Sequence, residues 1–473
     1  MRFTAVRPSA ALLPPVLVAV VLAALGGCGG SGSHTTTTTK ATTSPPAVAP
    51  PHPRRAVHFV VSDGDTGRPV AGAVVSAPGA IRRGASLLVL RKAKALVVTA
   101  RAPHYGSLQE RIVPGRGAIK LTLYRSDGQW LLYGGDPART QSQPAIRLRP
   151  PFHIAWARYL GSLIEYPAVV DQGVAYLNNL SGHLFALSMQ TGKTLWEVNM
   201  HSREQDSSPG VVGPMLVAHV KTGRVMVVRR STGKVMWDYP ASGEIESSPV
   251  VEHGIDYLGD WAGDVYALDL RTHRARWVYH DGCKVTASMA IAGPVIYFGD
   301  YCGRVVALRR SDGRPLWTAS AGSPVYGTSA VAGGRVFVPS RDAGALYAFS
   351  KSGAALWHVS TGGLVYSAPA VWHGRVYFGS YTGELYCVSA SSGAVLWRLQ
   401  VGGPISGSPT VIDGVVYVGS FAHRIVGADA RTGRTLFTFP HGEYVAVSGN
   451  RGKLLLYGWA SLWAVTPATR RGG

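Results

Sequence analysis

The chain has 473 residues, and 47 Lys and Arg against 26 Asp and Glu leave it a formal charge of +21. Hydrophobic residues make up 46% of it and charged residues only 15%, below the roughly 25% of an average globular domain. This apolar content can bury a large core, which excludes a wholly disordered chain. Four cysteines are too few for a disulfide scaffold, and no second long apolar run supports a polytopic membrane protein. The length predicts two or three domains.

Residues 1–27 are predicted to be an export signal. A basic start is followed by a mostly apolar run from Ala10 to Leu25 and by two glycines before Cys28. A Cys at this cleavage position resembles the bacterial lipoprotein lipobox, which implies lipidation of the Cys28 thiol and an extracytoplasmic, membrane-anchored protein. The alternative is an uncleaved anchor helix, which Pro14 and Pro15 and the shortness of the run disfavour.

Two segments are predicted between the signal and the main body. Residues 28–55 consist mostly of Gly, Ser, Thr and Pro, which predicts a disordered, partly extended tether, with mucin-like glycosylation as the alternative. Residues 56–126 contain short strand patterns separated by Gly, Pro and Asp turns, which predicts a small β-sandwich of immunoglobulin-like topology. The segment Asp63–Ala73 resembles the opening hairpin of carboxypeptidase regulatory-like domains, and this resemblance implies a spacer or adhesive module without catalytic residues.

An aromatic residue recurs every 40 or 41 residues through the remaining segment, 127–473. These positions are Trp156, Trp196, Trp237, Trp277, Trp317, Trp357, Trp397 and Phe437. Each unit contains four short strand patterns, a to d, joined by turns in which Gly recurs because it adopts positive φ without strain. Forty residues per four-stranded unit predict a β-propeller blade, with the aromatic residues packed between blades.

The eighth blade is predicted to form from both ends of this segment. Residues 445–464 supply strands a, b and c, and residues 151–159 read as a d strand with no partners before it. Pairing of the two would close the ring and leave no open sheet edge. The expected fold is therefore all-β, an eight-bladed β-propeller preceded by a small immunoglobulin-like sandwich.

The repeat resembles the pyrroloquinoline-quinone-type propeller repeat, whose blades read A-x-D-x-x-T-G-x-x-x-W. Ala267–Asp269 with Trp277 and Ala428–Asp429 with Thr432–Gly433 carry this motif best, and the lead-in 130–140 looks like the entry to such propellers. The resemblance covers the segment 127–473 and implies the fold, but many functions share one fold.

Three classes of propeller protein are compatible with this fold. Quinoprotein dehydrogenases hold their quinone under adjacent cysteines and bind calcium with carboxylates; no such set is found, so pyrroloquinoline quinone is not expected. The BamB family of outer-membrane assembly lipoproteins shares the lipobox and the repeat, which implies a non-catalytic scaffold or binding propeller, the interpretation that we favour. The third class is a ligand-binding or hydrolytic propeller, but HExxH, GxSxG and Walker motifs are missing and the histidines lack metal-ligand spacing. We expect no enzyme activity, no metal and no cofactor.

A ligand or partner is expected on the face formed by the d–a and b–c connections, around the central funnel. The candidate residues are Glu165, Asp206, Glu246, Trp261, Tyr301, Tyr326, Tyr366 and Tyr381. Acids come from three successive blades and aromatic rings from later ones, a combination that suits a cationic group, a peptide or a sugar. The alternative is that these are solvated loop charges and tyrosines packed between blades.

The expected propeller geometry separates the cysteines of this segment into a bonded pair and a free thiol. Cys283 falls in a d–a connection and Cys302 in the b–c turn of the same blade, on one face, so a disulfide is predicted between them in an exported protein. Cys387 occupies a c-strand position that holds small residues in other blades, which predicts a buried, packed thiol.

The net positive charge of the chain indicates which kinds of partner it could bind. Export argues against nucleic acid, and the basic residues spread through the turns favour envelope proteins or anionic envelope polymers as partners of a monomer. A simple solubility surplus is the alternative.

Overall fold

The computed structural model describes residues 54–468 except 85, 91–93 and 116. The predicted export signal, Cys28 and nearly all of the predicted tether lie outside these residues. The described part is all-β apart from one 3-10 turn, η1 (Ser126–Gly128). Within it, no helical segment combines the length and the apolar character needed to cross a bilayer.

Two sheets form the predicted sandwich. One has the order β3-β4-β1-β7 and contains Ile81–Arg83, Ser86–Leu90, Arg54–Asp63 and Ile119–Leu123; the other has the order β2-β5-β6 and contains Val74–Ser76, Leu96–Arg101 and Leu108–Ile112. Strand β1 begins at Arg54, two residues before the predicted boundary. Val57, Val98 and Leu121 are buried between the two sheets, so the alternating patterns do share one core.

The Asp63–Ala73 hairpin is held by a side-chain turn. The Asp63 Oδ1 accepts hydrogen bonds from the backbone N–H groups of Asp65 and Thr66, both at 3.0 Å. Asp commonly caps a turn in this way because its short carboxylate reaches the backbone two or three residues on. The turn chemistry of the sequence and the observed hairpin therefore agree.

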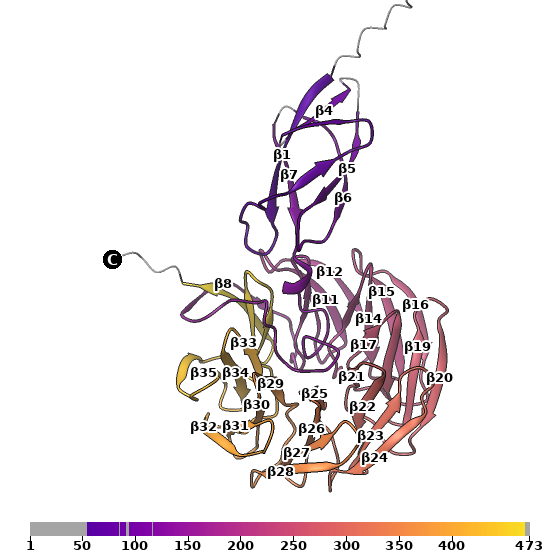
Figure 1. The fold of residues 1–473 in the computed structure, drawn as a ribbon, viewed down its shortest axis with the longest axis vertical. Helices are drawn as coiled ribbons and strands as arrows, with labels where there is room; N and C mark the ends of the chain where they lie inside the picture. The colour runs from indigo at the N-terminus through magenta and orange to yellow at the C-terminus, as the bar shows by residue number, and fades with distance from the viewer. Residues whose placement is uncertain (1–53, 85, 91–93, 116, 469–473) are drawn as a thin grey trace, which may run out of the picture. The chain divides into compact units, whose positions relative to one another are not determined.

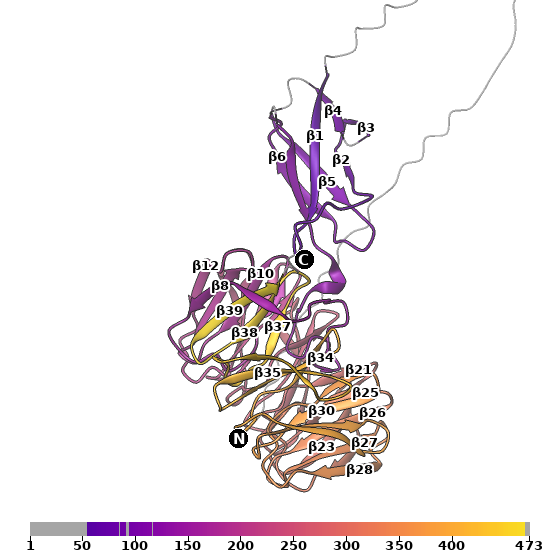
Figure 2. The same cartoon turned by 90° about the vertical axis from the view of Figure 1, so that its left-hand side faces the viewer.

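Eight four-stranded sheets, numbered here as blades 1 to 8, are arranged as a ring (Figures 1 and 2). Blades 1 to 4 contain β9–β12 (Val169–Asp171, Val174–Asn178, His183–Ser188, Thr194–Asn199), β13–β16 (Gly210–Val212, Met215–Val220, Arg224–Arg229, Val235–Pro240), β17–β20 (Val250–Glu252, Ile255–Gly259, Asp264–Asp269, Arg274–His280) and β21–β24 (Ala290–Ala292, Val295–Gly299, Arg304–Arg309, Pro315–Ser320). Blades 5 to 8 contain β25–β28 (Ala330–Ala332, Arg335–Ser340, Ala345–Ser350, Ala355–Ser360), β29–β32 (Ala370–Trp372, Arg375–Gly379, Glu384–Ser389, Val395–Gln400), β33–β36 (Thr410–Ile412, Val415–Ser420, Arg424–Asp429, Thr435–Phe439) and β37–β39 with β8 (Val447–Gly449, Leu454–Tyr457, Ser461–Pro467, Phe152–Tyr159).

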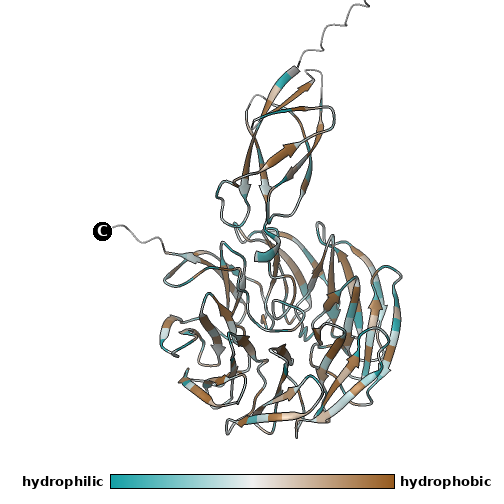
Figure 3. Cartoon of the chain, in the orientation of Figure 1, coloured by the Kyte–Doolittle hydropathy of each residue, from teal (hydrophilic) through white to brown (hydrophobic). Residues whose placement is uncertain are grey.

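The strands of a blade differ in burial. The b and c strands, such as β22 and β23, are buried at almost every position, because neighbouring blades cover both of their faces. The d strands, such as β24, alternate between half-buried and exposed residues. Figure 3 shows the corresponding run of hydrophobic residues along the strands.

The ring closes as predicted. Strand β39 pairs antiparallel with β8, with Ala464 opposite Trp156 and Ser461 opposite Tyr159. A strand from before the first blade thus completes the last one, and β39 has a partner strand on both sides.

Seven of the eight repeated aromatic rings pack on the c–d turn of the next blade. The eighth, Phe437, faces blade 8, whose c and d strands are not joined by a turn, and its ring meets that of Phe152 in β8 edge to face at 5.4 Å. A Cβ atom added to Gly192, Gly353 or Gly433 would lie 2.7–2.8 Å from an atom of Trp156, Trp317 or Trp397, respectively. The indole Nε1 of Trp317 also donates to the Lys351 carbonyl of that turn, at 2.7 Å. The turn glycine is therefore required twice, for its positive φ and for the room that the indole occupies.

Blade 3 is the exception in this series. His273 stands where the other c–d turns carry Gly, with φ of 59° in the left-handed region. Its ring stacks on Trp237 with the centroids 4.3 Å apart. In this blade, stacking of His273 on Trp237 thus takes the place of the glycine–indole contact of the other blades.

The cysteines lie where the repeat geometry predicts them. Cys283 and Cys302 form a disulfide with their Cα atoms 6.0 Å apart. Cys387 is free and buried in β31, and burial raises the pKa of its thiol to about 11. Cys387 is therefore an unreactive packing residue.

The indole–glycine contact can be tested with a matched pair of variants. Gly353→Ala should lower the free energy of unfolding by about 2–4 kcal/mol, because the methyl group both clashes with Trp317 and occupies the left-handed region. Gly374→Ala has the same positive φ but open space around it, and should cost only about 1 kcal/mol. Denaturant unfolding of both variants checks this; equal losses would contradict the packing role of the indole.

Removal of the disulfide should also weaken the propeller. The double variant Cys283→Ser, Cys302→Ser frees a loop with a sequence separation of 19 and should lose on the order of 3 kcal/mol of unfolding free energy. Cys387→Ser is the matched control and should leave the count of disulfide-bonded cysteines unchanged. Denaturant unfolding with thiol titration measures both, and unchanged stability of the double variant would contradict the prediction.

Candidate functional site

The three predicted acids come from the d–a connections of successive blades. Glu165 lies between β8 and β9, Asp206 between β12 and β13, and Glu246 between β16 and β17. Strand a begins at the funnel wall in every blade, so equivalent positions before it converge on the ring axis. The structure brings all three acids together.

The acids are not free to bind a cation, because Lys221 stands between them. Its Nζ lies 2.9 Å from Asp206 Oδ2 and also donates to Glu246 Oε1, and its side chain is 9% exposed. Burial alone would lower the pKa of Lys221, but the hydrogen bonds to Glu246 and Asp206 raise it. The negative charge of the acidic spot expected from the sequence is therefore countered in part by a cation of the chain itself.

Glu165 differs from the other two acids because it forms no ion pair with Lys221, and its pKa is raised. Burial, together with the neighbouring charge of Asp206, raises the pKa of Glu165 to about 7. Burial raises the pKa of Asp206 as well, although Lys221 opposes this. Near neutral pH Glu165 is thus about half protonated, and the side of the funnel that it lines carries little charge.

Aromatic rings continue the rim from blade 4 to blade 8, and we call them the aromatic arc. Its members are Tyr301, Tyr326, Tyr366, Tyr381, Phe421, Tyr444 and Trp459, with successive ring centroids 4.9–6.5 Å apart. Trp459, at the end of the arc, is 56% exposed. Rings at these separations contact one another edge to face or offset-stacked, which makes a continuous apolar surface.

Trp261 lies outside the arc and is covered by basic side chains. The Lys284 Nζ is 3.0 Å and the Lys221 Nζ 4.4 Å from its ring centroid. Arg341 donates from its guanidinium to the Tyr301 hydroxyl at 2.8 Å and pairs with Asp342. The site therefore places Trp261 and Tyr301 against cations that belong to the chain itself.

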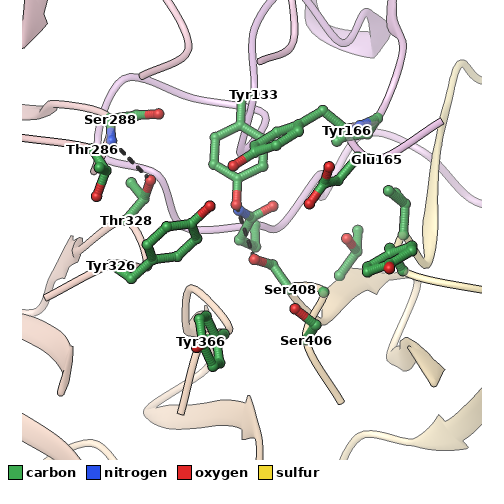
Figure 4. Close-up of a pocket in the computed structure, with 17 residues that line it drawn as sticks. Tyr133, Glu165, Tyr166, Thr286, Ser288, Tyr326, Thr328, Tyr366, Ser406 and Ser408 are labelled. Atoms are coloured by element: carbon green, nitrogen blue, oxygen red, sulfur yellow. Dashed lines mark hydrogen bonds between the residues drawn. The ribbon is translucent and has the colours of Figure 1, made fainter. Parts of the chain in front are cut away.

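A small pocket of about 70 Å³ opens between the acids and the arc, and we call it the funnel pocket (Figure 4). Its lining is Tyr133, Gln141, Glu165, Tyr166, Pro167, Thr286, Ser288, Tyr326, Gly327, Thr328, Tyr366, Ser406, Gly407, Ser408, Thr410, Tyr444 and Val445. Hydroxyl-bearing side chains dominate this list. Tyr133 donates to or accepts from Ser408 at 2.9 Å, and its ring meets that of Tyr166 edge to face.

The lead-in segment 130–143 supplies part of the pocket lining. Its carbonyl groups accept backbone hydrogen bonds from the innermost strands of several blades, for example from Val211 to Leu131, Ile291 to Pro137 and Val371 to Thr140, at 2.7–2.8 Å. The Arg139 guanidinium is fully buried and donates only to carbonyl oxygens, including those of Met289 and Ser248. The segment thus lies inside the ring of blades, which the sequence indicated only as an entry to the propeller.

Sequence reasoning missed Tyr444 and Trp459 because blade 8 is shorter than the others. The series that contains Tyr381 and Phe421 advances by 40, and Trp459 follows after only 38 residues. Continuing the series with a two-residue deletion would have found both residues. Lys284 and Arg341 gave no signal, since nothing in a repeat distinguishes a cation that packs on a ring from a solvated one.

The ring of four-stranded sheets with its 40-residue aromatic repeat defines a β-propeller of the PQQ-like repeat class. A family model described as outer membrane protein assembly factor BamB matches residues 180–293, 262–368 and 342–459, more than half of the chain. The chain therefore belongs to this family.

Curated relatives match a shorter part. The outer membrane protein assembly factor BamB of Yersinia pestis is 29% identical over 135 residues, which cover 25% of this chain and 34% of that protein. BamB of Moranella endobia is 25% identical over 132 residues with the same coverage. The match thus spans about a third of the length of these relatives.

Solved structures agree in fold. BamB of Moraxella catarrhalis superposes with a TM-score of 0.57 at 16% identity, covering 67% of this chain and all of that one. The quinohemoprotein alcohol dehydrogenase of Comamonas testosteroni gives a TM-score of 0.60 at 14% identity and covers 73% of this chain and 82% of its own. At such identities the likeness shows the propeller fold and no activity.

The raised pKa of Glu165 predicts a pH dependence of stability. Between pH 4.5 and about pH 7 the folded chain keeps a proton on Glu165 that the unfolded chain has released, so the free energy of unfolding falls as the pH rises through this range. Glu165→Gln keeps a neutral, hydrogen-bonding side chain, so it should remove about 1–3 kcal/mol of this fall. Unfolding free energies at pH 5 and pH 8 give the readout.

Burial and the neighbouring Asp300 also raise the pKa of Asp281 to about 7, so Asp281 lowers the unfolding free energy over the same pH range. The effect of Glu165 is therefore obtained by comparing variants. Glu110→Gln, in the exposed strand β6, is the control and should follow the unsubstituted protein. An unchanged pH dependence in Glu165→Gln would show that Glu165 does not hold the proton.

Proposed function

We propose that the protein is a non-catalytic binding propeller of the bacterial envelope, anchored through a lipid on Cys28 and monomeric. It binds an envelope protein or an anionic envelope polymer with its funnel face. The BamB-like family supports this role, because the matched relatives are named as assembly factors.

The observation that carries the proposal is the aromatic arc beside the funnel pocket. Seven rings from five blades meet on one face, and the arc ends in an exposed indole. Large aromatic surfaces that stay in contact with water are typical of binding sites, since burying them elsewhere would stabilise the fold. The surplus of positive charge would favour approach to an anionic envelope surface.

The residues of this chain do not fit a quinone cofactor. Cys283 and Cys302 are bonded across two connections and are not neighbours in sequence, so they offer no vicinal disulfide. Asp206 and Glu246 both bind the Lys221 ammonium, so these carboxylates are not free to coordinate a calcium ion. Our proposal therefore includes no quinone chemistry.

Site-specific photo-crosslinking in intact host cells tests the proposal. A benzophenone side chain at position 459 should form covalent adducts with an envelope component, because Trp459 is exposed at the end of the arc. The same probe at position 356 is the control: Leu356 is 46% exposed, but it lies beside the c–d turn of blade 5, at the opposite end of the blade from the d–a and b–c connections. Adducts resolved by mass spectrometry from position 459 and not from 356 are expected. Adducts from 356 alone, or from neither position, would reject the funnel face.

A further inference from the structure

The lining of the funnel pocket is polar but carries almost no charge. Among its described lining residues only Glu165 carries a carboxyl group, and its pKa of about 7 leaves it largely neutral below that pH. The carboxylates that could attract a cationic ligand already bind Lys221. Of the ligands that the sequence left open, a cationic group is thus the least suited.

The pocket presents hydrogen-bonding groups. The Thr286 hydroxyl is buried, with 5% of the residue exposed, and makes no hydrogen bond within the described part of the chain. Tyr326 and Tyr366 bring two further hydroxyl groups to the same space (Figure 4). Burial raises the pKa of both tyrosines, so both hydroxyls keep their protons. A ligand that both donates and accepts would satisfy these groups.

The rings beside these hydroxyls add an apolar surface. Tyr326 meets Tyr366 edge to face at 5.3 Å, and Tyr366 stacks on Tyr381 at 4.9 Å. A sugar ring combines a rim of hydroxyl groups with an apolar C–H face, and aromatic rings next to neutral hydroxyls match both parts. A peptide would instead need backbone partners or an apolar side-chain pocket, and this lining offers neither in quantity.

We propose that the funnel pocket binds a sugar residue of an envelope glycan. The sugar ring packs on Tyr366 and Tyr326, and its hydroxyl groups bond to Thr286 and to the tyrosine hydroxyls. Lys284 and Arg341, at the rim near Tyr301, lie close enough to tolerate an acidic substituent on the same glycan. This inference rests on the proposed function, whose binding face it narrows to one ligand class.

Calorimetric titration of the full-length chain tests the inference. The probes are oligosaccharides released from the host envelope, divided into a neutral and an acidic fraction, and a (Lys-Ala)5 peptide. We expect at least one saccharide fraction to bind and the peptide not to bind. Tyr366→Ala should weaken saccharide binding by about tenfold, the loss expected for one stacked ring. Thr286→Val, which only replaces the hydroxyl, should also weaken it.

Leu356→Ala removes an exposed side chain beside the c–d turn of blade 5, at the opposite end of the blade from the funnel connections, and should bind as the unsubstituted chain does. Thermal unfolding of each variant shows that the propeller is intact. Failure of both saccharide fractions to bind, or equal binding by Tyr366→Ala, overturns the inference. If saccharides fail while position 459 still forms cross-links to a protein, the glycan assignment falls and the binding face stands; if both experiments fail, both proposals fall.

Discussion

The contact of one aromatic ring with the c–d turn of the following blade governs the whole propeller. It recurs from Trp156 on Gly192 to Trp397 on Gly433, and blade 3 preserves it with His273 stacked on Trp237. Because this contact joins seven of the eight neighbouring pairs of blades, those blades turn by a similar amount relative to one another. Between blades 7 and 8 the Phe437 ring meets Phe152 edge to face instead. Uniform packing of this kind lets the ring close on itself, which a series of unequal contacts would prevent.

The site follows from what this packing leaves unconstrained. Rings and turn glycines must be alike in every repeat, whereas the d–a and b–c connections at the funnel are free to vary. They hold acids in the first three blades and tyrosines in later ones, and the ring geometry brings these different residues to one rim. A single folded repeat thus supports an asymmetric surface, with the Lys221 cluster on one side and the aromatic arc on the other.

The sequence was informative wherever periodicity or turn chemistry determines the structure. The blades, the pairing of β8 with β39 and the position of the two bonded cysteines all follow from spacing alone. Strand β3 was missed because it is only three residues long, and β6 because three exposed polar residues separate Leu108 from the buried Ile112, so neither shows an alternating pattern. The pairing of Lys221 with Asp206 and the course of the lead-in segment inside the ring depend on contacts between distant residues, which no local pattern records.

The source of the closing strand has a consequence for how the protein is made. Strand β8 emerges from the ribosome well before the residues of β39 that it pairs with, so during synthesis its edge waits unpaired while seven blades assemble. A chain that ends early would keep both that edge and the open side of blade 7 exposed, and exposed edges recruit other strands. Strand β39 therefore joins the two ends of the propeller segment in one sheet, and a truncation before Ser461 would leave β8 without its only partner strand.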